Sequence, residues 1–129
     1  MIVHRNALSA IDFEGLLIYD YTARQETNAS LATIEVPPGV RHREAWSKRS
    51  AKYYYVIAGQ ICFALDGQEH DLTAGDFCLV PQGQRFWYEN RTQEPATLIL
   101  VHVPSFDLDA EVFEEAAASQ RLGTEALEG

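Results

Sequence analysis

Short runs of β-branched, aromatic and aliphatic residues, most of them alternating with polar positions, follow one another from about residue 16 to residue 103. Such runs recur every 8–12 residues or so in β-sandwiches and barrels, with turn residues between them. The pattern therefore predicts an all-β sandwich or barrel. The runs read LLIYDYTA (16–23), SLATIEV (30–36), KYYYVIA (52–58), QICFALDG (60–67), DFCLVP (76–81), RFWYEN (85–90) and ATLILVHV (96–103).

Turn chemistry separates these runs at several points. Asp66-Gly67 lies between two strand-like runs and predicts a tight β-hairpin, because both residue types tolerate a positive φ. Pro37-Pro38-Gly39 and Ala74-Gly75-Asp76 predict further turns.

The two ends of the chain carry different patterns. Residues 109–120, DAEVFEEAAASQ, are rich in helix formers and predict a short C-terminal α-helix, with residues 121–129 as a frayed tail. Residues 1–8 are expected to form an edge strand. The whole chain, 1–129, is then one domain, with a barrel over about 12–104.

Composition narrows the function classes. The chain has 129 residues, is 47% hydrophobic and carries a net charge of −9, which argues against nucleic acid or an anionic membrane as a partner. No apolar run is long enough to span a membrane, and no secretory signal pattern occurs near residue 1. Two cysteines do not make a disulfide framework, so we expect a cytoplasmic protein.

Charge is unevenly distributed. Arg41, Arg43, Lys48, Arg49 and Lys52 fall within twelve residues that contain one acid. This basic segment is either a solvated turn or a binding site for an anion such as a carboxylate, phosphate or enolate.

Glycines and one P-x-G form a recognisable frame. Gly39 precedes positions 45, 47 and 52 and then Gly59, and Gly75 precedes Pro81-x-Gly83, position 86 and Asn90. This spacing resembles the two sequence motifs of the cupin superfamily. YYYVIAG resembles the strand sequence that ends the first motif, and LVPQG resembles the strand that leads into P-x-G in the second. The resemblance covers residues 30–104 and implies a double-stranded β-helix, the jelly-roll barrel of cupins.

The metal ligands of that family do not occur here. The resemblance implies two histidines, a glutamate and a third histidine, but Ala45, Ser47, Lys52 and Phe86 occupy those positions. Alanine and phenylalanine donate nothing to a metal, and an ammonium repels one. We therefore expect no metal and no other cofactor. The alternative is a displaced metal site made of His42, Glu44 and His102.

Strand alternation predicts which side chains share the interior. If the family's ligand positions point inward, so do three rows of residues, while Tyr53, Tyr55, Trp87 and Glu89 point outward. The inward rows are Lys52, Tyr54 and Val56; Phe86, Tyr88 and Asn90; and Arg43, Ala45 and Ser47.

Among the interior residues, four are candidate catalytic groups. Burial lowers the pKa of a lysine such as Lys52 and makes it usable as a base, an acid or a nucleophile. Tyr54 and Tyr88 can donate protons or stabilise an enolate. His102 titrates near neutral pH, and sequence alone leaves open whether it faces the pocket or the core. Each of these residues can instead be purely structural.

Five further residues are candidate substrate contacts. The arginines can clamp an anion and Trp46 can stack on a flat substrate, but a solvated loop or a structural lid explains them equally well. The candidates are Arg41, Arg43, Trp46, Ser47 and Phe86.

Three functions follow as hypotheses. The first is a metal-independent cupin enzyme, an isomerase, lyase or cyclase that acts by acid–base chemistry on a small anionic or carbonyl-containing metabolite. The second is a non-catalytic small-molecule-binding cupin, and the third is a metalloenzyme with displaced ligands. Exposed strand edges also predict a homodimer.

Overall fold

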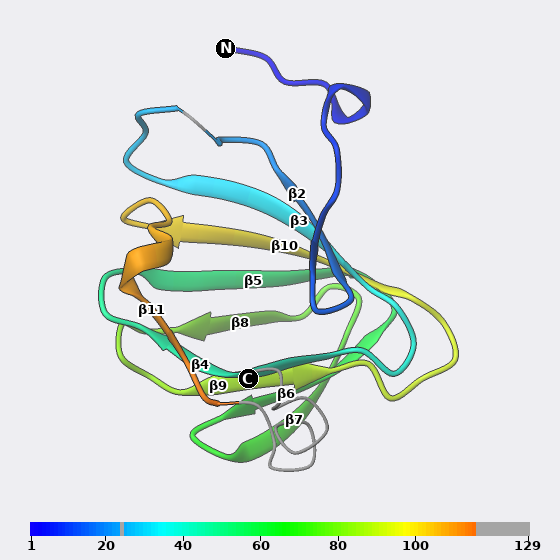
Figure 1. Cartoon of the computed structure of the whole chain (residues 1–129). Helices are drawn as coiled ribbons and strands as arrows, with labels where there is room; N and C mark the ends of the chain where they lie inside the picture. The colour runs from blue at the N-terminus through cyan, green and yellow to red at the C-terminus, as the bar shows by residue number, and fades with distance from the viewer. Residues whose placement is uncertain (24, 116–129) are drawn as a thin grey trace, which may run out of the picture.

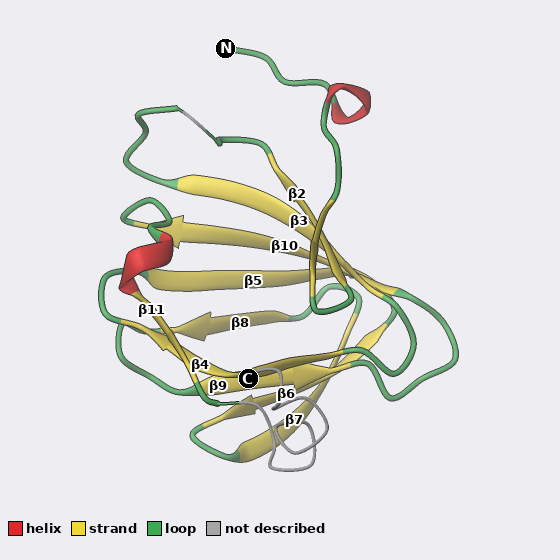
Figure 2. Cartoon of the chain, viewed as in Figure 1, coloured by secondary structure: helices red, strands yellow, loops and turns green. Residues whose placement is uncertain are grey.

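Two antiparallel β-sheets face each other and enclose the core (Figures 1 and 2). The structure is a computed structural model that describes residues 1–23 and 25–115. The six-stranded sheet has the order β1 (Ile11–Phe13), β2 (Leu16–Asp20), β3 (Ser30–Val36), β10 (Ala96–Val103), β5 (Ala51–Ala58) and β8 (Phe77–Val80). The five-stranded sheet has the order β11 (Glu111–Phe113), β4 (Arg41–Ser47), β9 (Phe86–Glu89), β6 (Gln60–Leu65) and β7 (Gln68–Thr73). This arrangement confirms the predicted all-β jelly roll.

The predicted hairpin is present between β6 and β7. Leu65 pairs with Gln68, so Asp66 and Gly67 make a two-residue loop, with φ values of 49° and 83°. Two successive positive φ values match the twist of the flanking strands, which is why this dipeptide favours a hairpin.

Alternation in the strands places the predicted residues inside. Lys52, Tyr54 and Val56 are buried on β5, while Tyr53 and Tyr55 are exposed. On β9, Phe86 and Tyr88 are likewise buried. On β10, His102 is 5% exposed and lines the cavity between the sheets, so its side chain faces the pocket.

A bulge in β4 changes the predicted orientation of its first half. His42 pairs with Tyr88 and Ala45 pairs with Phe86, so three steps on β4 match two steps on β9. The extra residue shifts the alternation, because a β-bulge reorients the side chains on one side of it. His42 therefore faces the interior, and Arg43, which alternation placed inside, instead pairs with Glu14 near the surface.

The predicted C-terminal helix is wrong for the residues that the structure describes. Leu108–Ala110 forms a short 3₁₀ helix, η2, and Glu111–Phe113 forms β11, while residues 116–120 lie outside the described residues. Pairing with β4 outweighs local helix propensity here. Backbone bonds from Lys48 N to Ala110 O (2.9 Å) and from Glu114 N to Glu44 O (2.8 Å) extend that pairing.

The N-terminal segment also differs from expectation. Residues 5–7 form the 3₁₀ helix η1 (Arg5–Ala7), and the edge strand is β1 instead. The Arg5 guanidinium lies 3.4 Å from the centre of the Tyr19 ring, which holds this segment against β2. No helix in the described part of the chain is long and apolar enough to cross a membrane.

Candidate functional site

A cavity of about 330 Å³ lies between the two sheets, and residues of β1, β2, η2 and β11 contribute to its wall. Its volume is at the lower end of the range for small-molecule sites. Apolar side chains form most of the wall, and a small group of polar side chains gathers in it. The lining residues are Ile11, Phe13, Ile18, Asp20, Ser30, Leu31, Ala32, Ile34, His42, Lys52, Tyr54, Tyr88, Leu100, His102, Phe106, Leu108, Glu111 and Phe113.

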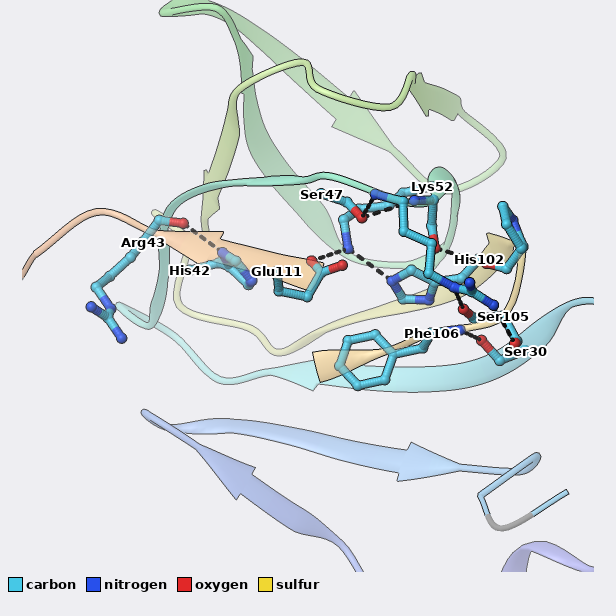
Figure 3. A network of polar contacts seen from close by, with 12 residues as sticks. Ser30, His42, Arg43, Ser47, Lys52, His102, Ser105, Phe106 and Glu111 are labelled. Carbon is cyan, nitrogen blue, oxygen red and sulfur yellow. Dashed lines mark hydrogen bonds and ion pairs between the residues drawn. The ribbon is translucent and has the colours of Figure 1, made fainter. Parts of the chain in front are cut away.

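A buried ion pair is the strongest polar feature of this cavity (Figure 3). Lys52 Nζ lies 2.7 Å from Glu111 Oε1, and the two side chains are 4% and 3% exposed. His102 Nε2 lies 2.8 Å from the same ammonium nitrogen. An ammonium has only donors, so Nε2 of His102 must be the acceptor. Two of the three ammonium protons of Lys52 are thus donated in hydrogen bonds, to Glu111 and to His102.

Burial and mutual repulsion set the charges of this group. Burial lowers the pKa of His102 to about 3, and the nearby ammonium adds to that effect. Burial also lowers the pKa of Lys52, while the Glu111 carboxylate opposes that shift. At neutral pH His102 is therefore uncharged.

His42 occupies a second polar position on the wall. Its Nδ1 lies 2.6 Å from the backbone oxygen of Arg43, which can only accept, so Nδ1 carries the proton. Nε2 is then an unprotonated acceptor, and no hydrogen bond to it occurs among the described residues. The rings of Phe86 and Tyr88 each lie 5.0 Å from the imidazole ring. Burial lowers the pKa of His42 to about 4, so the ring is neutral at pH 7.

Two tyrosines line the cavity beside these groups. Tyr54 and Tyr88 are fully enclosed, and their rings lie 5.6 Å apart. Burial raises the pKa of both phenols, so both stay protonated at neutral pH and can donate hydrogen bonds. The Tyr88 hydroxyl is buried and has no hydrogen-bond partner within residues 1–23 and 25–115.

All four residues predicted as catalytic thus share one cavity, whereas the five predicted substrate contacts lie outside its wall. Ser47 Oγ instead accepts from Arg49 N (3.1 Å) and Ser50 N (2.9 Å). Phe86 packs beneath the site, with its ring centre 5.5 Å from Lys52 Nζ.

The remaining predicted contacts are engaged near the surface. The Arg41 guanidinium lies 4.3 Å from the centre of the Trp87 ring, and the Arg85 guanidinium lies 3.9 Å from the centre of the Trp46 ring. Arg43 lies 2.8 Å from Glu14. The basic segment is therefore dispersed and forms no shared anion site around the cavity.

Sequence reasoning missed Glu111 and Phe113, because it placed both on a helix. It named His42 as a possible metal ligand or a residue at the cavity mouth, and not as a base. The bulge that turns His42 inward leaves no signal in a single sequence, and the pairing of β11 with β4 joins residues far apart in the chain.

The positions where cupins hold a metal offer no ligand set here. Ala45 and Phe86 are packed in the core, Ser47 caps a turn, and Lys52 presents an ammonium. These residues do not fit a divalent metal. Within the described ranges no group of three or more His, Cys, Asp or Glu side chains is placed to hold a metal, so His42, Glu44 and His102 do not come together as a ligand set.

The fold defines a double-stranded β-helix protein with an internal cavity of about the size of a small molecule. Residues 32–102 match the cupin domain family, and since this is more than half of the chain, the chain belongs to that family. The tetracenomycin polyketide synthase protein TcmJ of Streptomyces glaucescens is 34% identical over 73 residues, 57% of this chain and 49% of the relative. The match thus spans about half the length of that relative.

Solved structures share the fold. Pac13 of Streptomyces, described as a nucleoside dehydratase, has a TM-score of 0.79 and 21% identity over 93% of this chain and 95% of its own. Variants of Pac13 are known with uridine. A predicted oxalate decarboxylase of Thermotoga maritima has a TM-score of 0.74 and 18% identity over 81% of this chain and 99% of its own.

Removing either partner of the buried ion pair is expected to destabilise the fold. In Lys52→Met or Glu111→Leu the remaining charge is buried without its partner, and each variant should lose about 3 kcal/mol of unfolding free energy. The double variant should lose at least about 2 kcal/mol less than the sum of the two, because no isolated charge remains. Urea denaturation measures all three.

Lys48→Met is the matched control, because Lys48 is an exposed lysine. It should change the unfolding free energy by less than about 0.5 kcal/mol. Additive losses in the double variant would contradict the assigned ion pair.

Proposed function

We propose that this cupin is an enzyme of the lyase or isomerase type that removes a proton from a carbon next to a carbonyl group, with His42 as the base. The observation that carries the proposal is the fixed tautomer of His42. Its Nδ1 proton is bound to the Arg43 carbonyl oxygen, and its unprotonated Nε2 is available in a cavity of metabolite size. A general base needs this combination of a free lone pair and a fixed orientation.

The neighbouring groups suit the later parts of such a reaction. When His42 takes the proton, the electron pair of the broken C–H bond moves onto the carbonyl oxygen and forms an enolate. The protonated phenol of Tyr88 and the remaining donor of Lys52 can stabilise that oxygen. In an elimination, the enolate electrons re-form the carbonyl and make a carbon–carbon double bond while the β-hydroxyl group leaves as water with the proton from His42. In an isomerisation, His42 instead delivers the proton to a different carbon of a conjugated enolate.

Metal independence is part of the proposal. Support comes from the chemistry of the four positions where the family's ligands would lie, since Lys52 occupies the glutamate position and is already paired with Glu111. The lyase alternative also accords with the name of one similar protein, a nucleoside dehydratase.

Proton abstraction can be tested without a known substrate. The protein is incubated in D₂O with a panel of β-hydroxy aldehydes and ketones, sugar-derived and aromatic, and deuterium incorporation or loss of water is followed by NMR. His42→Asn should lower the rate at least about 100-fold, because Asn can keep a donor near the Arg43 oxygen but has no base at the Nε2 position. His70→Gln, at an exposed position on β7, should leave the rate unchanged.

The pH dependence provides a second readout. Because the pKa of His42 is lowered to about 4, the base stays unprotonated and kcat/KM should hold level from neutral pH down to about 5. It should fall only near pH 4, whereas an ordinary histidine would lose activity near pH 6.5. Binding of panel members without exchange or water loss would instead establish the binding-module alternative.

We also propose a homodimer formed through the outer face of the six-stranded sheet. Directly paired positions on β8, β5 and β10 carry apolar side chains there, in the rows Leu79–Tyr53–Val101 and Phe77–Tyr55–Ile99. Tyr53, Tyr55 and Phe77 are 39%, 45% and 56% exposed. These three rings alone present about 300 Å², more than a third of the roughly 800 Å² that each subunit buries in a standard interface.

A second copy of the chain is the occupant that this face fits. No charged residue lies among the outward positions of β5, β8 and β10, so the face needs no partner of opposite charge. A two-fold axis through an uncharged apolar face brings it against itself.

Analytical ultracentrifugation tests the dimer. The wild-type chain should sediment at twice its monomer mass of 14.5 kDa. Tyr55→Glu should shift it to monomer, because two carboxylates would be buried near the axis. Ile2→Glu, at an exposed apolar position outside the face, should have no effect. A monomeric wild-type protein, or a dimeric Tyr55→Glu variant, would overturn this interface.

A further inference from the structure

The polar end of the cavity has two unused acceptor atoms. Glu111 Oε2 is buried and has no hydrogen-bond partner in the described part of the chain, while Oε1 of the same carboxylate binds Lys52. His42 Nε2 is the second acceptor. A buried acceptor without a partner is costly, so Glu111 Oε2 calls for a ligand that brings a hydrogen-bond donor, and His42 Nε2 can accept from a second donor.

The charges in the wall do not favour an anion. Asp20, Lys52 and Glu111 are its charged members, and the last two neutralise each other at 2.7 Å. Asp20 remains, a half-buried carboxylate that accepts from Thr22 N at 3.1 Å and has no cationic partner among the described residues. An incoming carboxylate or phosphate would meet Asp20 and the free oxygen of Glu111, and no unpaired cation among the described lining residues offsets them.

The cations that could have attracted an anion are engaged elsewhere. Arg43 binds Glu14, and Arg49 donates to the backbone oxygen of Ser105 at 2.9 Å. Neither of these residues lines the cavity. Of the two alternatives that the sequence left open for the basic segment, this arrangement favours solvated cations over an anion site at the cavity.

The rest of the wall suits an apolar or flat body. Phe13, Ile18, Leu100 and Phe113 line the cavity, and the rings of Phe13 and Phe113 lie 5.4 Å apart. Side chains of this kind bury an unsaturated or aliphatic ring at little desolvation cost.

We propose that the cavity selects an uncharged, hydroxylated molecule with a compact apolar or flat body, whose hydroxyl groups donate to Glu111 Oε2 and His42 Nε2, and that it rejects the phosphorylated or carboxylated form of the same molecule. This inference rests on the proposed function only for the use of this cavity as the substrate site. It concerns equilibrium binding, so it can fail or hold independently of proton abstraction.

Matched pairs of neutral and anionic probes test the selectivity at neutral pH by titration calorimetry and ligand-detected NMR. The pairs are uridine and uridine 5′-monophosphate, 2-phenylethanol and 2-phenylethyl phosphate, and glucose and glucose 6-phosphate. At least one neutral member should bind with a Kd of about 1 mM or tighter. Its anionic partner should bind at least 10-fold more weakly.

Two variants connect the preference to named atoms. Glu111→Gln should weaken binding of the neutral probe at least 10-fold, because the amide does not reproduce the acceptor at Oε2. Asp20→Asn should narrow the ratio of neutral to anionic affinity at least threefold, since it removes the unpaired wall charge and keeps the acceptor for Thr22 N. Asp76→Asn is the matched control: Asp76 also accepts a backbone N–H, from Thr73 at 2.8 Å, but does not line the cavity.

Several outcomes would overturn the inference. One is an anionic probe that binds as tightly as its neutral partner, and another is the absence of binding by every neutral probe. An unchanged ratio in Asp20→Asn would also do so, and this variant covers the case in which Glu111→Gln fails to fold. Selective binding of neutral probes without any proton exchange would leave this inference standing while refuting the proposed enzyme.

Discussion

The buried ion pair between Lys52 and Glu111 is the interaction on which the site depends. It joins β5 of one sheet to β11 of the other across the end of the cavity. An ammonium at this depth is tolerated only with a partner, so Glu111 must reach it. That requirement holds residues 111–113 extended along β4, and with them Phe113, which lines the cavity. The same strand, β11, thus covers one side of the cavity with Phe113 and neutralises Lys52 with Glu111.

The same ion pair also lowers the net charge of the polar groups that line the cavity. With Lys52 neutralised, and with His42 and His102 uncharged because burial lowers the pKa of each, the polar groups act through hydrogen bonds more than through net charge. The aromatic rings around His42 hold the imidazole in one orientation, and the Arg43 oxygen holds it in one tautomer. Acid–base chemistry by a neutral imidazole is the use that this environment favours.

Local patterns sufficed for some parts of the structure and failed for others. The period of two in β5 and β9 places Lys52, Tyr54 and Tyr88 inside, because the alternation in these strands is unbroken over those residues. A bulge interrupts the alternation in β4, so His42 faces the interior and Arg43, which alternation placed inside, lies near the surface. Glu111 was unpredictable for a different reason: its strand exists only through pairing with Ser47 and its neighbours, a contact between distant parts of the chain that local propensity cannot report.

The proposed chemistry requires that His42 is a neutral base with its proton on Nδ1. Long-range ¹H–¹⁵N correlation spectra of the histidine side chains, recorded between pH 7 and pH 3.5 and assigned with His42→Asn, test it most directly. We expect a protonated Nδ1 and an unprotonated Nε2 from neutral pH down to about pH 4, where the ring first gains a second proton. A proton on Nε2 in the neutral ring, or an imidazolium already formed near pH 6.5, would contradict it.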